Sequence, residues 1–324
     1  MKQETSIARR ANKPAGPCNT YGYSMQLSAT SEPLCEKAIR WIMAGMAFTS
    51  LFALLGIMLF LFAEGLPLFV SYSPGKFFSG MFWYPTSEPP EFGILPLIIA
   101  SLAVMLVAVC IAVPLGVLTA AYLTEIAEST VRRIVKPFVE LLAALPSVVI
   151  GFFGMVVVAP FLQETFDLAT GLNLFNAGLI LAFMSVPTIC SVAEDALFAV
   201  PRSLREASLA LGATRWETTR MVVLPAALSG IGTAVMLGMS RAIGETMVVL
   251  MVAGGAAMIP GSLFDPVRPM PASIAAEMAE APFRGDHYHA LFATGLVLFL
   301  FTLCFNLLAH YISERYKQTG SSSL

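Results

Sequence analysis

The sequence predicts an all-α, multi-pass membrane protein with about six transmembrane helices. Hydrophobic residues make up 57% of the 324-residue chain and charged residues only 12%, whereas soluble domains carry roughly a quarter charged residues. The mean hydropathy is +0.76. The apolar residues also gather in long uncharged runs, and a helix needs about 20 such residues to cross the hydrocarbon core. The net charge of −2 gives no bulk positive field that would favour a nucleic-acid partner.

Six apolar runs are long enough to cross a membrane. They cover residues 41–63, 92–123, 141–162, 174–193, 221–259 and 290–312. The second run is longer than one crossing requires, so we expect it to be tilted, or kinked near Pro96 or Pro114. The fifth run is interrupted by Arg241 and Glu245 and has room for an additional half-helix.

The distribution of lysine and arginine between the runs predicts the orientation. Fifteen of these residues fall in the N-terminal tail, the second-to-third connection, the fourth-to-fifth connection and the C-terminal tail, against three in the other connections. Because positively charged loops stay on the cytoplasmic side, both termini and the loop 194–220 are expected to face the cytoplasm.

The segments outside the runs complete the expected organisation. Residues 1–40 lack the apolar core and cleavage site of a signal peptide, so we expect a retained, disordered cytoplasmic tail. Residues 313–324 form a second cytoplasmic tail. The loop 64–91 is expected on the periplasmic side, with Trp83 and Tyr84 at the level of the lipid headgroups.

A charged segment between the fourth and fifth runs carries the most specific motif. Its spacing involves Arg205, Glu206, Ala207, Ser208, Gly212, Leu224 and Pro225. Good helix formers precede Gly212, a natural place for a helix to end. The pattern resembles the EAA loop of ABC-importer permeases, with Ser208 where a second Ala is usual. The resemblance implies that residues 202–225, the coupling loop, bind a separate ATPase. The alternative is an amphipathic helix that rests on the lipid surface.

ATP itself is expected to bind elsewhere. No GxxxxGK[ST] phosphate loop occurs in the chain, so the chain is expected to be a transport subunit rather than an enzyme. No cofactor or metal ion is expected on it either. His287 and His289 lack a third well-spaced ligand, and the five cysteines show no CxxC spacing.

Arg241 and Glu245 are the second candidate site, because charges within a membrane span are costly and usually functional. Their i, i+4 spacing predicts that both lie on one helical face and can form an ion pair. The planar guanidinium of Arg241 suits an oxyanion, to which it can donate two hydrogen bonds. Glu245 would position the guanidinium or accept a proton from phosphate. A structural ion pair between helices is the alternative.

Several segments resemble the phosphate-specific (Pst) ABC-importer permeases. They include AVPLGVLTAAYLTEIA at 112–127, ELLAALPSVVIGFFG at 140–154 and RAIGETMVVLMVAGG at 241–255. The resemblance extends over residues 92–312 and is closer to PstC-type than to PstA-type subunits. It implies a type I (MetI-like) permease domain in the bacterial cytoplasmic membrane and a role for Arg241 and Glu245 in phosphate passage.

The same resemblance implies a set of partners. These are a PstA-like second permease, a PstB-like ATPase dimer that binds ATP and Mg²⁺, a PstS-like periplasmic phosphate-binding protein and membrane lipid. Two alternatives remain open from the sequence. One is a permease for sulfate, molybdate or tungstate, and the other is a secondary anion carrier or a phosphate-sensing membrane subunit.

Overall fold

The computed structural model describes residues 34–317, so the parts of the two predicted tails at 1–33 and 318–324 lie outside the described residues. The chain divides into two units, residues 1–56 and residues 57–324, and the boundary falls within α1 (Leu34–Gly65). Because α1 begins at Leu34, residues 34–40 are helical, although the sequence analysis placed them in the N-terminal tail. The apolar side chains of α1 before the boundary are mostly exposed.

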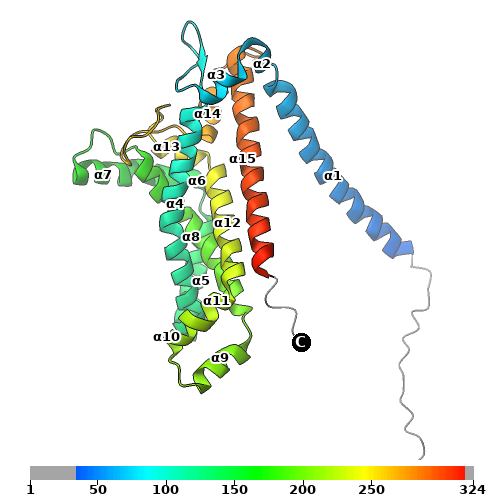
Figure 1. Cartoon of the computed structure of the whole chain (residues 1–324), viewed down its shortest axis with the longest axis vertical. Helices are drawn as coiled ribbons and strands as arrows, with labels where there is room; N and C mark the ends of the chain where they lie inside the picture. The colour runs from blue at the N-terminus through cyan, green and yellow to red at the C-terminus, as the bar shows by residue number, and fades with distance from the viewer. Residues whose placement is uncertain (1–33, 318–324) are drawn as a thin grey trace, which may run out of the picture. The chain divides into compact units, whose positions relative to one another are not determined.

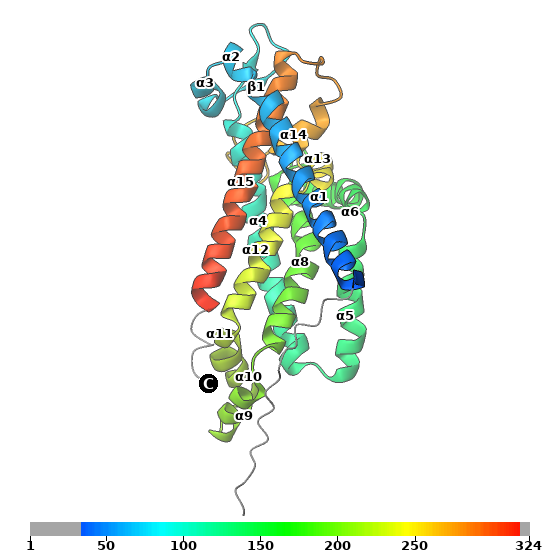
Figure 2. The same ribbon diagram turned by 90° about the vertical axis from the view of Figure 1, so that its right-hand side faces the viewer.

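Four long helices form the body of the larger unit (Figures 1 and 2). They are α4 (Leu95–Ala121), α8 (Leu174–Phe198), α12 (Leu228–Gly244) and α15 (Asp286–Lys317). Helix α8 packs against both α4 and α12. Small residues permit this close approach: a Cβ on Gly178 of α8 would lie 2.4 Å from a methyl carbon of Val107 on α4.

The number of candidate membrane spans agrees with the sequence prediction. Within residues 34–317, five helices are long and apolar enough to cross a membrane, and six if one bent pair counts as a single span. They are Ala38–Ser71, Leu95–Ile126, Ser147–Phe166, Leu174–Phe198, Asp286–Leu308 and the bent pair Arg215–Ala226 with Leu228–Gly244. The predicted all-α, multi-pass class is confirmed.

Two spans differ in detail from the prediction. The third begins at Ser147 rather than Leu141, because Leu145 and Pro146 have extended backbones that end α5 (Ser129–Ala144). It consists of α6 (Ser147–Phe153), a π-helical turn η2 (Gly154–Val158) and α7 (Ala159–Phe166).

The fifth region is broken twice. A 71° bend separates Arg215–Ala226 from α12, and a second break after Gly244 precedes the short helix α13 (Met247–Val252). The additional half-helix allowed by the sequence is therefore present.

Short helices gather at one end of the larger unit, here called the α9 end (Figures 1 and 2). They are the π-helical turn η1 (Tyr122–Ile126), which continues α4, and then α9 (Arg202–Ala210), α10 (Arg215–Thr218), the π-helical turn η3 (Thr219–Val223) and α11 (Leu224–Ala226). The predicted coupling loop thus lies beside the ends of α4 and α8.

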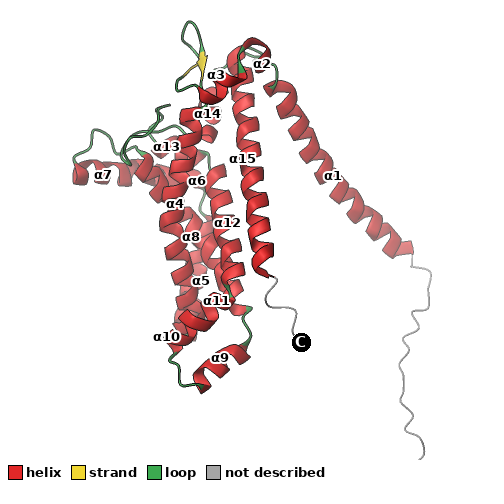
Figure 3. Ribbon diagram, viewed as in Figure 1, coloured by secondary structure: helices red, strands yellow, loops and turns green. Residues whose placement is uncertain are grey.

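The opposite end carries α2 (Leu68–Ser71), α3 (Pro74–Ser79), α14 (Met270–Glu277) and the antiparallel strands β1 (Trp83–Tyr84) and β2 (Glu91–Phe92), drawn in yellow in Figure 3. Trp83 pairs with Phe92 and is 2% exposed. The Trp83 ring therefore packs inside the protein and does not face lipid. The indole N–H explains why, because it donates to the Glu277 carboxylate at 2.9 Å, and a buried indole needs such an acceptor.

Candidate coupling and substrate-pathway sites

Helix α9 presents an apolar surface at the end of the larger unit. Leu204, Leu209 and Leu211 are 44%, 46% and 90% exposed, and Glu206 and Ala207 are exposed beside them. The helix ends where the sequence predicts, because Gly212 has a φ of +88°, in the left-handed region that glycine tolerates best. Exposed leucines on a short, rigid element suit docking into a groove of another protein.

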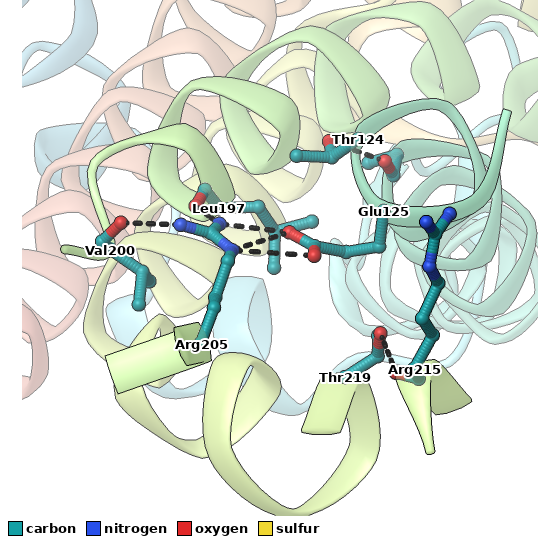
Figure 4. A network of polar contacts seen from close by, with 8 residues as sticks. Thr124, Glu125, Leu197, Val200, Arg205, Arg215 and Thr219 are labelled. Atoms are coloured by element: carbon teal, nitrogen blue, oxygen red, sulfur yellow. Dashed lines mark hydrogen bonds and ion pairs between the residues drawn. The ribbon is translucent and has the colours of Figure 1, made fainter. Parts of the chain in front are cut away.

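Arg205 points into the chain rather than towards this exposed surface (Figure 4). Its Nη2 lies 2.8 Å from Oε1 of Glu125 on η1. Its Nη1 donates to the Val200 carbonyl at 2.6 Å, and Nη2 also donates to the Leu197 carbonyl at 2.8 Å. One side chain of the coupling loop therefore contacts the ends of two other helices.

Ser208 also faces inwards. Its hydroxyl lies 2.9 Å from the Thr218 hydroxyl on α10, so the departure from Ala in the motif adds a hydrogen bond between α9 and α10. Helix α10 begins with a capping box in which Thr214 and Glu217 satisfy each other's backbone amides. The last two motif residues, Leu224 and Pro225, open α11, where the missing N–H of proline costs little.

Glu194 is a buried acid that the sequence analysis missed. The fourth span was expected to end at Ala193, but α8 continues to Phe198 and leaves the Glu194 side chain 2% exposed. Its carboxylate binds Arg132 at 2.8 Å and Lys136 at 3.2 Å, both on α5. The only signal in the sequence was an acid directly after an apolar run.

Arg241 lies in the last turn of α12 with an exposed side chain. Its Nη1 donates to Oγ1 of Thr188 on α8 at 3.3 Å. The exposed apolar side chains of Leu237 and Met247 lie before and after it along the chain. An exposed cation near apolar side chains is suited to binding an anion.

The predicted helical pairing of Arg241 with Glu245 is wrong. Helix α12 ends at Gly244, and Glu245 has an extended backbone (φ −74°, ψ 127°), so the i, i+4 geometry does not apply. Among residues 34–317, no ion pair joins these two side chains and no hydrogen bond engages the Glu245 carboxylate. The carboxylate is half-buried and is left available to a ligand.

Small residues recur every four positions along this part of the chain, at Ala226, Gly230, Ala234 and Gly238, and the last three form a ridge on α12. Ala234 is fully buried, and a Cβ on Gly230 or Gly238 would collide with side chains of α8. Ala226 is exposed because it precedes the 71° bend. The ridge therefore holds α12 against α8 and brings Arg241 next to Thr188.

Two histidines in the first turn of α15 take part in hydrogen bonds at the other end of the unit. His287 Nε2 lies 2.9 Å from Oε2 of Glu277, which also binds Arg268. His289 Nδ1 lies 2.7 Å from the Glu64 carbonyl. Within the described range 34–317, no group of three or more His, Cys, Asp or Glu side chains is placed to hold a metal ion.

Comparison with known proteins gives a consistent result. Residues 112–318 match the family model described as the binding-protein-dependent transport system inner membrane component. The chain is 39% identical to the probable ABC transporter permease protein YqgH of Bacillus subtilis, over 90% of this chain and 94% of that protein. It is also 39% identical to the phosphate transport system permease protein PstC of Mesorhizobium japonicum, over 74% of this chain and 78% of that protein.

Solved structures with the same fold are more distant in sequence. A bacterial alginate ABC transporter matches with a TM-score of 0.60 and 17% identity, over 88% of this chain and 98% of that one. The inward-facing MetNI methionine ABC transporter matches with a TM-score of 0.52 and 22% identity, over 69% of this chain and 94% of that one. The MetI-like architecture expected from the sequence is thereby confirmed.

Proposed function

Because the chain belongs to the family of binding-protein-dependent transport system inner membrane components, we propose that it is the permease subunit of an ATP-driven importer of inorganic phosphate. The observation that carries the cargo assignment is the similarity to PstC proteins. The identity is 39% to the protein from Mesorhizobium japonicum and 35% to the one from Haemophilus influenzae, over about three quarters of this chain.

Members of this family work with an ATPase and a substrate-binding protein. For this chain we propose a PstB-like ATPase dimer, which binds ATP and Mg²⁺, a PstS-like phosphate-binding protein and a PstA-like second permease. The membrane is the bacterial cytoplasmic membrane. The α9 end faces the cytoplasm, as the fifteen-to-three distribution of Lys and Arg favours.

The coupling loop transmits the ATPase cycle. The exposed leucines of α9 dock on the ATPase dimer, and closure of that dimer on ATP moves α9. This movement shifts the permease between outward- and inward-facing states, each of which is favoured by different contacts with the ATPase.

Arg241 contacts the anion. Its guanidinium can donate two parallel hydrogen bonds to phosphate oxygens, and a second permease opposite its exposed surface would enclose the pathway. Glu245 supplies selectivity in this proposal. Its free carboxylate accepts a hydrogen bond from the protonated oxygens of HPO₄²⁻ or H₂PO₄⁻, whereas fully deprotonated sulfate has no hydrogen to donate.

The test is uptake of labelled phosphate into vesicles that contain all the partner proteins, with sulfate, arsenate or molybdate as competitor. Arsenate carries the same protons as phosphate and should compete, whereas sulfate and molybdate should not. Preferential uptake of sulfate or molybdate would overturn the cargo assignment. Phosphate uptake that persists without ATP would identify a secondary carrier instead.

A further inference from the structure

We propose that Glu125 is a positioning residue for transport, because it ties the coupling helix α9 to the end of α4 through Arg205. In this arrangement, movement of α9 reaches α4 and α8 directly, and not only along the chain through α10 and η3 into α12. The inference rests on the proposed function as an ATP-driven importer. It adds a route of coupling inside this chain that the motif alone does not contain.

The Arg205 guanidinium binds both the Glu125 carboxylate and two backbone carbonyls, as a link between helices requires. Its Nε lies 3.2 and 3.3 Å from the two oxygens of Glu125, and its Nη2 lies 2.8 Å from Oε1. The same guanidinium donates to the carbonyls of Leu197 and Val200. Leu197 lies in the last turn of α8 and Val200 lies just after it, and a cation at a helix C-terminus is favoured by the helix dipole.

The burial of the pair distinguishes it from a surface salt bridge. The side chains of Arg205 and Glu125 are 19% and 11% exposed, so solvent screens their attraction only in part. A bidentate, partly buried pair of this kind also defines an orientation. By contrast, the neighbouring Arg202 and Glu206 are exposed. Both pairs line a pocket of about 310 Å³, together with Thr124 and Phe198.

The backbone on either side of α9 explains why a side-chain link is needed. Before α9, the helical chain stops at Phe198 and Pro201 has an extended conformation. After α9, Gly212 has a positive φ, and no atom lies within 4 Å of the position its Cβ would occupy. Both covalent connections are therefore non-helical hinges. Without lateral contacts, α9 would rotate on them when an ATPase pulled on it.

Two lateral contacts prevent this rotation. The Arg205–Glu125 pair joins α9 to η1 and α4, and the Ser208–Thr218 hydrogen bond joins α9 to α10. The first contact is charged and bidentate, and it includes the end of α8 as well. It is therefore the stronger of the two constraints, and Glu125 is its acceptor.

The experiment compares Glu125→Gln, Glu125→Asp and wild type in the complete reconstituted complex. Three quantities are measured: co-purification of the ATPase, ATP hydrolysis stimulated by the loaded binding protein, and ions imported per ATP hydrolysed. Glu125→Gln should keep the ATPase bound but lower the imported ions per ATP by about tenfold. Glu125→Asp retains the charge and should recover most of the ratio. Glu128→Gln, at an exposed position on the same loop, should match wild type.

Arg205→Gln and the double variant with Glu125→Gln complete a double-mutant cycle. The double variant should be no worse than Arg205→Gln alone, because both substitutions break the same pair. Fully additive losses would overturn the proposal. So would a wild-type ratio in Glu125→Gln, or a loss of the ATPase from that complex in proportion to the loss of uptake.

The outcome is separable from that of the cargo assignment. If the cargo is not phosphate, the wild-type complex will not import phosphate. The number of ions imported per ATP would then be measured with the ion that the wild type does import. A wrong linkage would leave wild-type uptake intact and would appear only in the comparison of the Glu125 and Arg205 variants with wild type.

Discussion

The backbone of Gly230 on α12 packs directly against the methyl group of Ala196 on α8. A Cβ at position 230 would lie only 2.3 Å from the Ala196 Cβ, closer than two carbon atoms can approach. The methyl group of alanine has no rotamer to change, so the two helix backbones themselves determine this distance. The contact therefore makes residue size at position 230 critical for the α8–α12 packing that places Arg241.

Gly230→Ala should destabilise the protein by about 1–3 kcal/mol, because the added methyl group forces the two helices apart. Gly232→Ala is the matched control two residues along the same helix, where an added Cβ meets no atom within 4 Å. That substitution should be neutral or stabilising by roughly 0.5–1 kcal/mol, since glycine is a poor helix former. Thermal unfolding of the detergent-purified variants measures the difference. Equal melting temperatures would contradict the packing argument.

Glu194→Gln should destabilise the contact between α5 and α8, because Arg132 and Lys136 would lose their shared carboxylate. Removing one partner of a fully buried pair costs about 3–5 kcal/mol. Here the two basic side chains are 31% and 36% exposed and regain some hydration, so we expect about 1–3 kcal/mol. Asp195→Asn, at the adjacent exposed carboxylate, should leave the unfolding temperature unchanged. A similar shift in both variants would show that burial of Glu194 is unimportant.

The spans and the coupling loop could be predicted from the sequence because both depend on local properties. Hydropathy over about 20 residues identifies a span, and Gly212 marks the helix end within its own loop. The ridge on α12 is equally local for Gly230, Ala234 and Gly238, since they share one face of a continuous helix.

The contacts that were wrongly predicted or not predicted from the sequence depend on distant segments or on where a helix ends. Trp83 finds its acceptor Glu277 at a separation of 194 residues, and Glu194 is buried only because α5 packs over it. The pairing of Arg241 and Glu245 assumed a continuous helix. The i, i+4 rule no longer holds once the helix stops at Gly244.

Gly212→Val should weaken docking of the ATPase through strain rather than through collision. The position has a φ of +88° and open space around it, and a β-branched residue is strongly disfavoured in that conformation, by about 1–2 kcal/mol or more. Gly212→Asn is the matched variant, because asparagine tolerates the left-handed region. Co-purification of the ATPase with the permease should fall for Val and remain near wild type for Asn. Loss in both variants would indicate that the ATPase contacts position 212 itself.

Arg241→Gln should abolish phosphate uptake while the complex with the ATPase still assembles. In the part of the chain that the structure describes, the guanidinium makes one hydrogen bond, to Thr188 at 3.3 Å, so its loss changes the fold little. Arg241→Lys retains the charge but not the planar fork, and should raise the KM for phosphate by about tenfold or more. Arg133→Gln removes an exposed cation from α5 and serves as the control for net charge, with uptake expected at the wild-type level. Unchanged uptake in Arg241→Gln vesicles, measured with labelled phosphate, would remove Arg241 from the pathway.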